Sequence, residues 1–220
     1  MAKTNQGLVE YARKQIGRPY WYGTFGNIAT AVLYSAKKKQ YPKYYASWTN
    51  FPEQFGQRVH DCVGLIKGYL WSDTASSTPR YNASQDVSAN GMLSICTEKG
   101  TISSMPDIPG VLVFMSGHVG VYAGNGEVIE ARGHEYGVVV TKLAERPWKN
   151  WGKCPFISYD IQSTVKIKPG TWNVRSGPGT KYKSITVVKG GTVITYSKTA
   201  ENGWKYLPSY KGWISPKGVE

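Results

Sequence analysis

Cys62 and His118 are the residues whose types and settings best suit nucleophilic catalysis. His60-Asp61-Cys62 precedes an apolar pattern of helical period, which predicts that the thiol lies at a helix N-terminus. The helix dipole and free N–H groups there favour a thiolate and can hold an oxyanion. His118 opens a strand-like pattern, and an imidazole close to a thiol can accept its proton. The two residues therefore predict a Cys–His pair that attacks a carbonyl carbon.

Glu130 is the candidate for the group that orients the imidazole. A two-residue hairpin loop at Asn125-Gly126 would leave Glu130 on the sheet face opposite His118. A three-residue loop beginning at Gly124 would put both side chains on one face, and its glycines supply the positive φ that a bulged turn needs. We therefore predict the three-residue loop and a hydrogen bond from the imidazole to Glu130. The alternative is a surface glutamate paired with Arg132.

The cysteines and histidines do not form a metal-binding pattern. Cys62, Cys96 and Cys154 are odd in number and widely spaced, so they do not resemble a disulfide framework. Neither a CxxC pair nor an HExxH motif is present among the three cysteines and three histidines. We expect no metal and no other cofactor.

The periodicity of the first 158 residues predicts an α+β domain, with helices packed on an antiparallel sheet. Apolar spacing predicts helices at 7–16 and 62–71, and Gly64 and Gly68 on one face of the second helix would permit close backbone approach to a sheet. Residues 24–57 lack clear periodicity and are interpreted as a mostly irregular insertion with one short helix. Alternating patterns predict strands at 110–115, 118–123, 128–132 and 137–142.

A second, smaller domain is predicted after a linker at 159–164. Residues 165–220 alternate short strands with Gly/Pro turns, which is typical of a small all-β barrel. The net charge of the chain is +13, and residues 164–220 hold ten Lys+Arg against two Asp+Glu. The smaller domain is therefore the better candidate for binding an anionic polymer.

Four ordered motifs of the first domain resemble those of the NlpC/P60 peptidases, which are papain-like hydrolases of the bacterial cell wall. The motifs are Gly17-Arg18-Pro19-Tyr20-Trp21-Tyr22-Gly23, Asp61-Cys62-Val63-Gly64-Leu65, Pro109-Gly110 and His118-Val119-Gly120-Val121-Tyr122. The resemblance covers roughly residues 7–158. It implies that Cys62 is the nucleophile and His118 the base, and that Tyr20, Trp21 and Asp61 line the substrate cleft.

The sequence departs from the family pattern at two positions. Val63 stands where the family usually has serine after the nucleophile, and the backbone N–H needed there remains. Glu130 stands where the family commonly has a histidine as its third polar residue. A carboxylate can orient and stabilise an imidazolium in the same way.

The C-terminal segment resembles bacterial SH3-type (SH3b) wall-binding domains. The matching residues are Trp172 to Gly179, Gly203-Trp204 and Gly212-Trp213-Ile214. The resemblance implies wall contacts by Trp172, Arg175, Trp204 and Trp213, although tryptophans of such small barrels more often belong to the core.

Together these patterns predict an endolysin-like peptidoglycan hydrolase that cuts the stem peptide after D-glutamate. An N-acetylmuramoyl-L-alanine amidase is the alternative on the same residues, and a non-catalytic wall- or nucleic-acid-binding protein is the alternative of another class. The expected partners are peptidoglycan and anionic wall polymers rather than nucleic acid, and we expect a monomer without membrane insertion. No secretory signal precedes Gly7. We therefore expect synthesis in a host cytoplasm and action after the membrane is breached.

Deleting residues 164–220 should weaken wall binding more than cleavage of soluble fragments, because that segment carries a net charge of +8. Cosedimentation with purified walls measures the binding. Moderate salt should weaken it too, since exposed charges are screened over about 8–10 Å at physiological ionic strength. Equal sedimentation of the truncated and full chains would contradict this division of roles.

Overall fold

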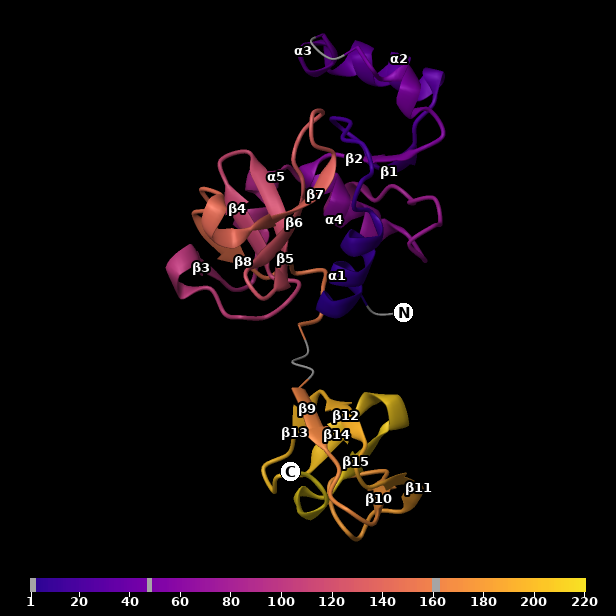
Figure 1. Cartoon of the computed structure of the whole chain (residues 1–220), viewed down its shortest axis with the longest axis vertical. Helices are drawn as coiled ribbons and strands as arrows, with labels where there is room; N and C mark the ends of the chain where they lie inside the picture. The colour runs from indigo at the N-terminus through magenta and orange to yellow at the C-terminus, as the bar shows by residue number, and fades with distance from the viewer. Residues whose placement is uncertain (1–2, 47–48, 160–162) are drawn as a thin grey trace. The chain divides into compact units, whose positions relative to one another are not determined.

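The chain, seen in a computed structural model, divides into two units, Met1–Tyr159 and Asp160–Glu220 (Figure 1). The structure describes residues 3–46, 49–159 and 163–220. The predicted linker at 159–164 lies partly outside these residues, and 163 and 164 are the first residues of strand β9 (Ser163–Lys166). Within the described residues, every helix is too short or too polar to cross a membrane.

Helix α4 (Cys62–Trp71) has the bounds that the apolar pattern predicts. Its N-cap is Asp61, whose side chain accepts a hydrogen bond from the N–H of Gly64 at 2.6 Å. Eight of its ten residues are buried, because other helices and strands of the first unit pack around it. Burial on nearly all sides explains why the pattern is apolar throughout.

The backbone of another segment lies close to α4 at both glycines, and at Gly68 that backbone belongs to a two-stranded sheet. A Cβ atom on Gly64 would lie 1.8 Å from the carbonyl oxygen of Thr24. A Cβ atom on Gly68 would lie 2.9 Å from the carbonyl oxygen of Phe25, in strand β1 (Phe25–Ile28). The partner is therefore the start of β1, which pairs with β2 (Arg58–His60) just before Cys62.

A six-stranded antiparallel sheet forms the second layer of the first unit, in the order β3-β8-β4-β5-β6-β7. The four predicted strands are confirmed to within two residues as β4 (Leu112–Met115), β5 (His118–Gly124), β6 (Glu127–Ala131) and β7 (Val138–Lys142). The sheet is completed by β3 (Lys99–Thr101) and β8 (Asn150–Gly152).

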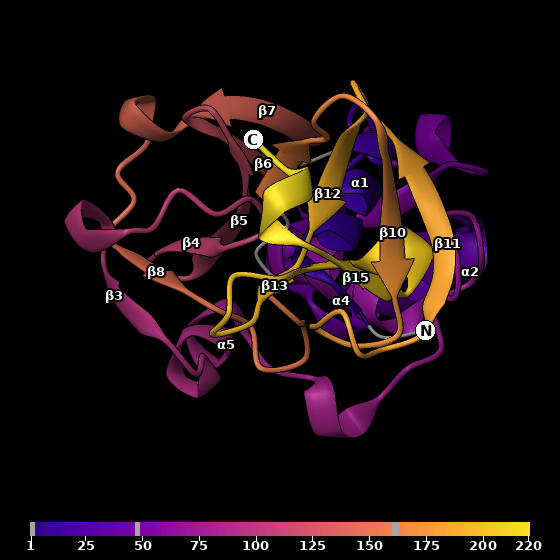
Figure 2. The same ribbon diagram turned by 90° about the horizontal axis from the view of Figure 1, so that it is seen from below.

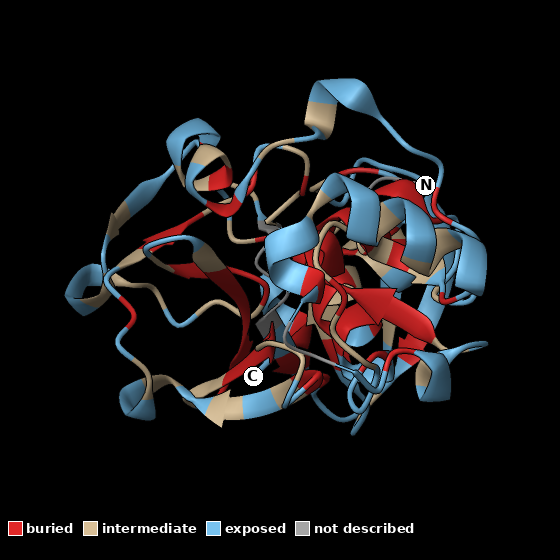
Figure 3. Ribbon diagram, turned by 90° about the horizontal axis from the view of Figure 1, so that it is seen from above, coloured by how far each residue is buried: buried red, intermediate tan, exposed pale blue. Residues whose placement is uncertain are grey.

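The two faces of this sheet are covered differently. One face packs against α1 (Asn5–Lys14), α4 and α5 (Ala89–Ile95) in a large apolar core. The other face carries a smaller cluster of Val113, Tyr122, Val128 and Trp148. Figure 3 shows buried residues gathered on the central elements and exposed residues on the outlying helices and connections.

The β5–β6 hairpin differs from the predicted three-residue loop. Gly124 pairs with Glu127, so the loop contains only Asn125 and Gly126. Gly124 and both loop residues have positive φ, the conformation that a primed turn requires at its centre. A bulge between Tyr122 and Gly124 then shifts the register. Because of this shift, Glu130 lies on the same face of the sheet as His118, which is the arrangement that the three-residue loop was predicted to give.

The prediction that residues 24–57 are mostly irregular is wrong. Besides β1, the segment contains α2 (Ala31–Gln40), α3 (Pro42–Tyr45) and a 3-10 turn at Pro52–Gln54. Buried Trp21, Tyr45 and Phe51 form an aromatic core for it, with ring centroids 4.8–6.2 Å apart. Helix α2 has no buried residue and therefore no apolar stripe that periodicity could detect.

The second unit is all β, but its described strands do not close into one barrel. One sheet has the order β11-β10-β15-β14-β13, and β12 pairs separately with β9. Figure 2 shows β10 beside β11. The strands are β10 (Thr171–Arg175), β11 (Ser184–Lys189), β12 (Val193–Tyr196), β13 (Lys198–Thr199), β14 (Lys205–Leu207) and β15 (Gly212–Ile214). Eight buried residues, among them Ile167 and Leu207, form its own core.

Replacing Gly64 by alanine should destabilise the first unit, because its Cβ would overlap the Thr24 carbonyl oxygen. We expect the free energy of unfolding to fall by at least about 2 kcal/mol in urea denaturation. Gly91→Ala in α5 is the matched control, since that Cβ would lie 3.2 Å from a side-chain atom of Val87. Its effect should stay within about 1 kcal/mol, and equal losses in both variants would contradict the packing argument.

Candidate active site

The Cys62 thiol lies at the N-terminus of α4, beside the start of β5. Its Sγ is 4.0 Å from the carbonyl oxygen of Gly117, and the N–H of Val119 also interacts with it. These two residues flank His118, so the fold brings the predicted nucleophile and base together at the start of the interior strand β5. Cys96 and Cys154 are free thiols too, but both are buried in the core.

The electrostatic setting of Cys62 differs from the expected thiolate. Burial raises the pKa of the thiol to about 12, and the adjacent Asp61 carboxylate adds to this effect. Hydrogen bonds from the N–H groups of Val63 and Val119 offset the rise only in part. The free thiol is therefore protonated at neutral pH, and attack requires a base to take the proton.

His118 is held by the predicted contact with Glu130. Its Nε2 is 2.6 Å from Oε2 of Glu130, whose side chain is completely buried. Because a carboxylate only accepts, Nε2 carries the hydrogen in this contact. The lone pair of the neutral ring then lies on Nδ1, the nitrogen available to a thiol.

The Glu130 carboxylate accepts further hydrogen bonds from two residues that sequence reasoning missed. Thr141 Oγ1 donates to Oε1 at 2.7 Å, and Arg146 donates from Nε at 3.0 Å and from its terminal nitrogen at 3.1 Å. Burial alone would raise the pKa of Glu130, but the bonds from His118, Arg146 and Thr141 outweigh it and hold the pKa at about 2. Glu130 is thus ionised, and its cationic partner is Arg146 rather than Arg132.

Trp148 packs against the imidazole ring of His118. Its ring stacks on the His118 imidazole at a centroid distance of 5.6 Å and an interplanar angle of 15°. Gly120 leaves the room for this, since a Cβ there would lie 3.0 Å from the indole. The stack and the carboxylate together restrict rotation of the imidazole. Trp148 gave no signal in the sequence because it follows the last predicted strand by several residues.

Asp61 and Tyr20 lie close to the thiol. Asp61 Oδ1 caps α4, and Oδ2 accepts a hydrogen bond from the N–H of Gly23 at 2.8 Å, so the residue has the structural role of an N-cap. Burial raises the pKa of Tyr20, and the nearby Asp61 carboxylate adds to this effect, which keeps the phenol protonated. The Tyr20 ring packs edge-on against His134 at 5.1 Å.

Trp21 does not line the cleft as expected. Its side chain has no exposed surface, and its Nε1 donates to Oε1 of Gln54 at 2.6 Å. It belongs to the aromatic core of the insertion, together with Tyr45 and Phe51. His60 is also internal, and burial lowers its pKa to about 3. Among the described residues no cluster of His, Cys, Asp and Glu is suited to a metal ion.

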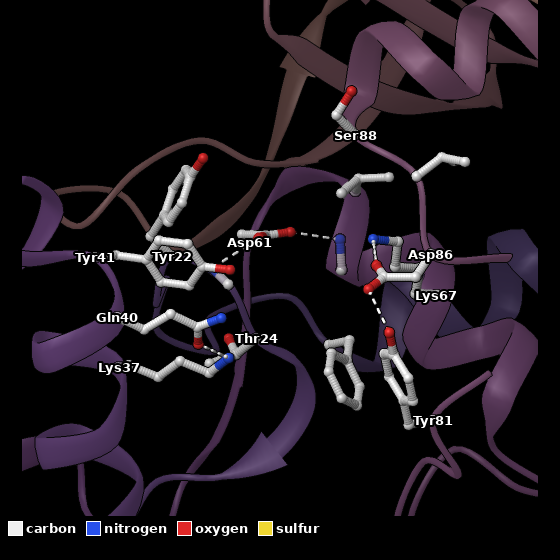
Figure 4. A pocket seen from close by; sticks show the side chains of 15 residues that line it. Tyr22, Thr24, Lys37, Gln40, Tyr41, Asp61, Lys67, Tyr81, Asp86 and Ser88 are labelled. Atoms are coloured by element: carbon white, nitrogen blue, oxygen red, sulfur yellow. Dashed lines mark hydrogen bonds and ion pairs between the residues drawn. The ribbon is translucent and has the colours of Figure 1, made fainter. Parts of the chain in front are cut away.

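A pocket of about 530 Å³ opens beside the N-terminus of α4 (Figure 4). Asp61, Val63 and Gly64 form its wall next to the nucleophile. Lys37 and Tyr41 come from the insertion on the opposite side. The pocket therefore lies between Asp61 and Val63, which flank Cys62 in the chain, and a segment that the sequence left without a role.

The four candidate residues of the second unit have different environments. Trp204 is buried, at 7% exposure, so its position is that of a core residue rather than a wall contact. Trp172 is partly buried and donates to the carbonyl oxygen of Lys168 at 3.0 Å. Arg175 donates to the carbonyl oxygen of Tyr182, and Trp213 packs against Tyr206 at 5.3 Å.

Replacing Glu130 by glutamine should lower stability most at neutral pH. The folded pKa of about 2 lies below the ordinary 4.5, so the ionised carboxylate stabilises the fold above pH 4.5. This contribution is lost as the pH falls from 4.5 toward 2, and the difference between wild type and variant should shrink over that window. Thermal unfolding at several pH values measures it.

Glu127→Gln is the matched control in the same strand, since Glu127 is half-exposed and forms only long ion pairs at 3.5 and 3.8 Å. A Glu130→Gln deficit that stays constant from neutral to acid pH would contradict the assignment of an ionised Glu130.

The model of the NlpC/P60 family matches residues 44–155, slightly more than half of the chain. A search of curated proteins found no match.

Three solved structures illustrate the similarity, all at low sequence identity. The NlpC/p60 domain of the peptidoglycan hydrolase SagA is 18% identical, with 68% of this chain and 98% of that chain covered at a TM-score of 0.39. RipB, a peptidoglycan hydrolase from Mycobacterium tuberculosis, is 19% identical, with 70% and 67% covered at a TM-score of 0.40. Ly7917 is 17% identical, with 97% and 92% covered at a TM-score of 0.35.

The family match includes the nucleophile helix, the strand that begins at His118 and the strand that carries Glu130. The chain therefore belongs to the NlpC/P60 family, whose members are cysteine peptidases and peptidoglycan hydrolases.

Proposed function

We propose that this chain cuts an amide bond of the peptidoglycan stem peptide by cysteine catalysis, as an endopeptidase acting after D-glutamate. The observation that carries the proposal is the 2.6 Å contact between His118 and a buried, ionised Glu130 beside the Cys62 thiol. This arrangement contains a nucleophile, a base and a group that orients the base.

In the proposed reaction, Nδ1 of His118 takes the thiol proton as Sγ attacks the amide carbonyl carbon. The N–H groups of the first turn of α4 stabilise the resulting oxyanion. The imidazolium then gives its proton to the leaving amine, and the C–N bond breaks to leave a thioester on Cys62. Water, deprotonated by the same imidazole, hydrolyses the thioester and restores the thiol.

The environment of Glu130 suits this cycle. An imidazolium forms twice, and the ionised carboxylate stabilises it each time. Arg146 and Thr141 keep that carboxylate ionised inside the protein, where an unpaired charge would be costly. Because Arg146 neutralises part of the charge, the carboxylate orients His118 without taking its proton.

We also propose that the second unit binds the wall in the manner of an SH3b domain and that the protein acts as an endolysin. The support is the net charge of +8 on residues 164–220 and the motifs at Trp172 and Trp213. An anionic, peptide-decorated wall is the complementary partner. Action on the wall after release from the cell is part of this proposal.

Cys62→Ala should abolish the release of fragments from purified peptidoglycan while leaving the fold and wall binding intact. Cys96→Ala and Cys154→Ala are the controls, and both should retain activity because these thiols lie in the core. Alkylation with iodoacetamide should inactivate the enzyme, whereas a chelator should have no effect. Full activity of Cys62→Ala, or chelator inhibition reversed by zinc, would contradict the mechanism.

Mass spectrometry of the released fragments identifies the bond. A new amino terminus on the residue after D-glutamate supports the endopeptidase. A stem peptide released with a free N-terminal L-alanine would instead identify an amidase, because the same thiol–imidazole pair can attack either amide.

A further inference from the structure

In the pocket beside the N-terminus of α4, the charged hydrogen-bond acceptors are engaged, whereas the charged donors are not fully used. It contains two carboxylates, Asp61 and Asp86, and all four of their oxygens already accept hydrogen bonds. Asp61 accepts from backbone N–H groups, whereas Asp86 accepts from Lys67 at 2.5 Å and from Tyr81 at 2.9 Å. The acidic groups of the pocket are therefore engaged within the protein.

The ammonium groups of the pocket keep unused donors. Each lysine ammonium has three N–H donors. Lys67 pairs with Asp86, and Lys37 donates to the neutral side chain of Gln40 at 3.2 Å. No carboxylate among the described residues lies within ion-pair distance of Lys37. A ligand that supplies acceptors, and negative charge in particular, is the complement of such a pocket.

The insertion holds Lys37 at this place. Helix α2 begins at a Thr30 N-cap and carries Lys37 and Gln40 in its last turn, with Tyr41 directly after it. The Lys37 ammonium lies 5.5 Å from the Tyr41 ring centroid, and its side chain is half-buried. Figure 4 shows Lys37, Gln40 and Tyr41 on the insertion side of the pocket, facing Asp61 and Lys67.

Burial in the pocket removes water from the Lys37 ammonium. Burial lowers the pKa of its ammonium, and the more distant charges of Asp61 and Asp86 only partly compensate. An anion bound at Lys37 would restore the interactions that the ammonium loses by leaving water.

We propose that this pocket is a subsite for a carboxylate of the wall peptide and that Lys37 of the insertion is the residue that pairs with it. The proposal rests on the proposed function, which makes a peptide the substrate, and carboxylate is the anion that a peptide itself carries. Lys67 is the second donor, held in place by Asp86. The insertion thereby determines specificity for the charge state of the substrate.

The test compares synthetic stem peptides that differ only in one carboxylate, which is present free or converted to the carboxamide. The wild-type protein should cut the free-carboxylate member of one such pair with a kcat/KM about 10-fold higher. Lys37→Gln should remove this preference by raising KM for the carboxylate peptide. Its kcat/KM for the carboxamide peptide should stay within about twofold of wild type.

Lys38→Gln is the matched control, because Lys38 is the exposed neighbour in the same helix and does not line the pocket. It removes the same charge from α2 and should leave the preference unchanged. Equal loss in both variants would overturn the subsite in favour of general attraction by a basic surface. An unchanged preference in Lys37→Gln would also overturn it.

Binding of the same peptide pairs to Cys62→Ala protein, by calorimetry, separates this inference from the proposed function. A carboxylate preference that depends on Lys37, without cleavage by the wild type, would support the subsite and contradict the hydrolase. Cleavage without any carboxylate preference would support the hydrolase and overturn the subsite.

Discussion

The buried, ionised carboxylate of Glu130 is the interaction on which the catalytic arrangement depends. A charge without exposed surface is tolerated only when donors surround it, and here they come from β5, β7 and the segment after β7. Satisfying Glu130 therefore brings these segments together. The same requirement determines the orientation of His118, because the imidazole is one of the donors.

The nucleophile and the base are complementary in their electrostatics. The Cys62 thiol is protonated at rest, since burial and Asp61 oppose the thiolate. Its N-cap aspartate is needed to begin α4, so the residue that positions the thiol also disfavours its ionisation. Deprotonation then depends on His118, whose tautomer Glu130 sets. This geometry favours transfer of the proton during attack over a standing ion pair.

The insertion between α1 and the nucleophile helix adds a layer with its own packing. Trp21, Tyr45 and Phe51 give it an aromatic core, so that α2 needs no buried side chain of its own. Helix α2 packs against this core through the partly buried Leu33 and Tyr34, so its last turn can present polar groups to the pocket. Lys37 and Gln40 illustrate this, because they extend into the pocket beside Asp61.

The sequence by itself determined the elements whose packing follows a local period: helix 62–71, the four central strands, and through ordered motifs the candidates Cys62 and His118. Only the tertiary structure decided what depends on residues distant in the chain. The partners Thr141 and Arg146 and the burial of Trp21 are contacts between separate elements, which no periodicity encodes. The hairpin shows the boundary most clearly. Asn125-Gly126 marked the turn, but the bulge that places Glu130 beside His118 follows from pairing across the whole sheet.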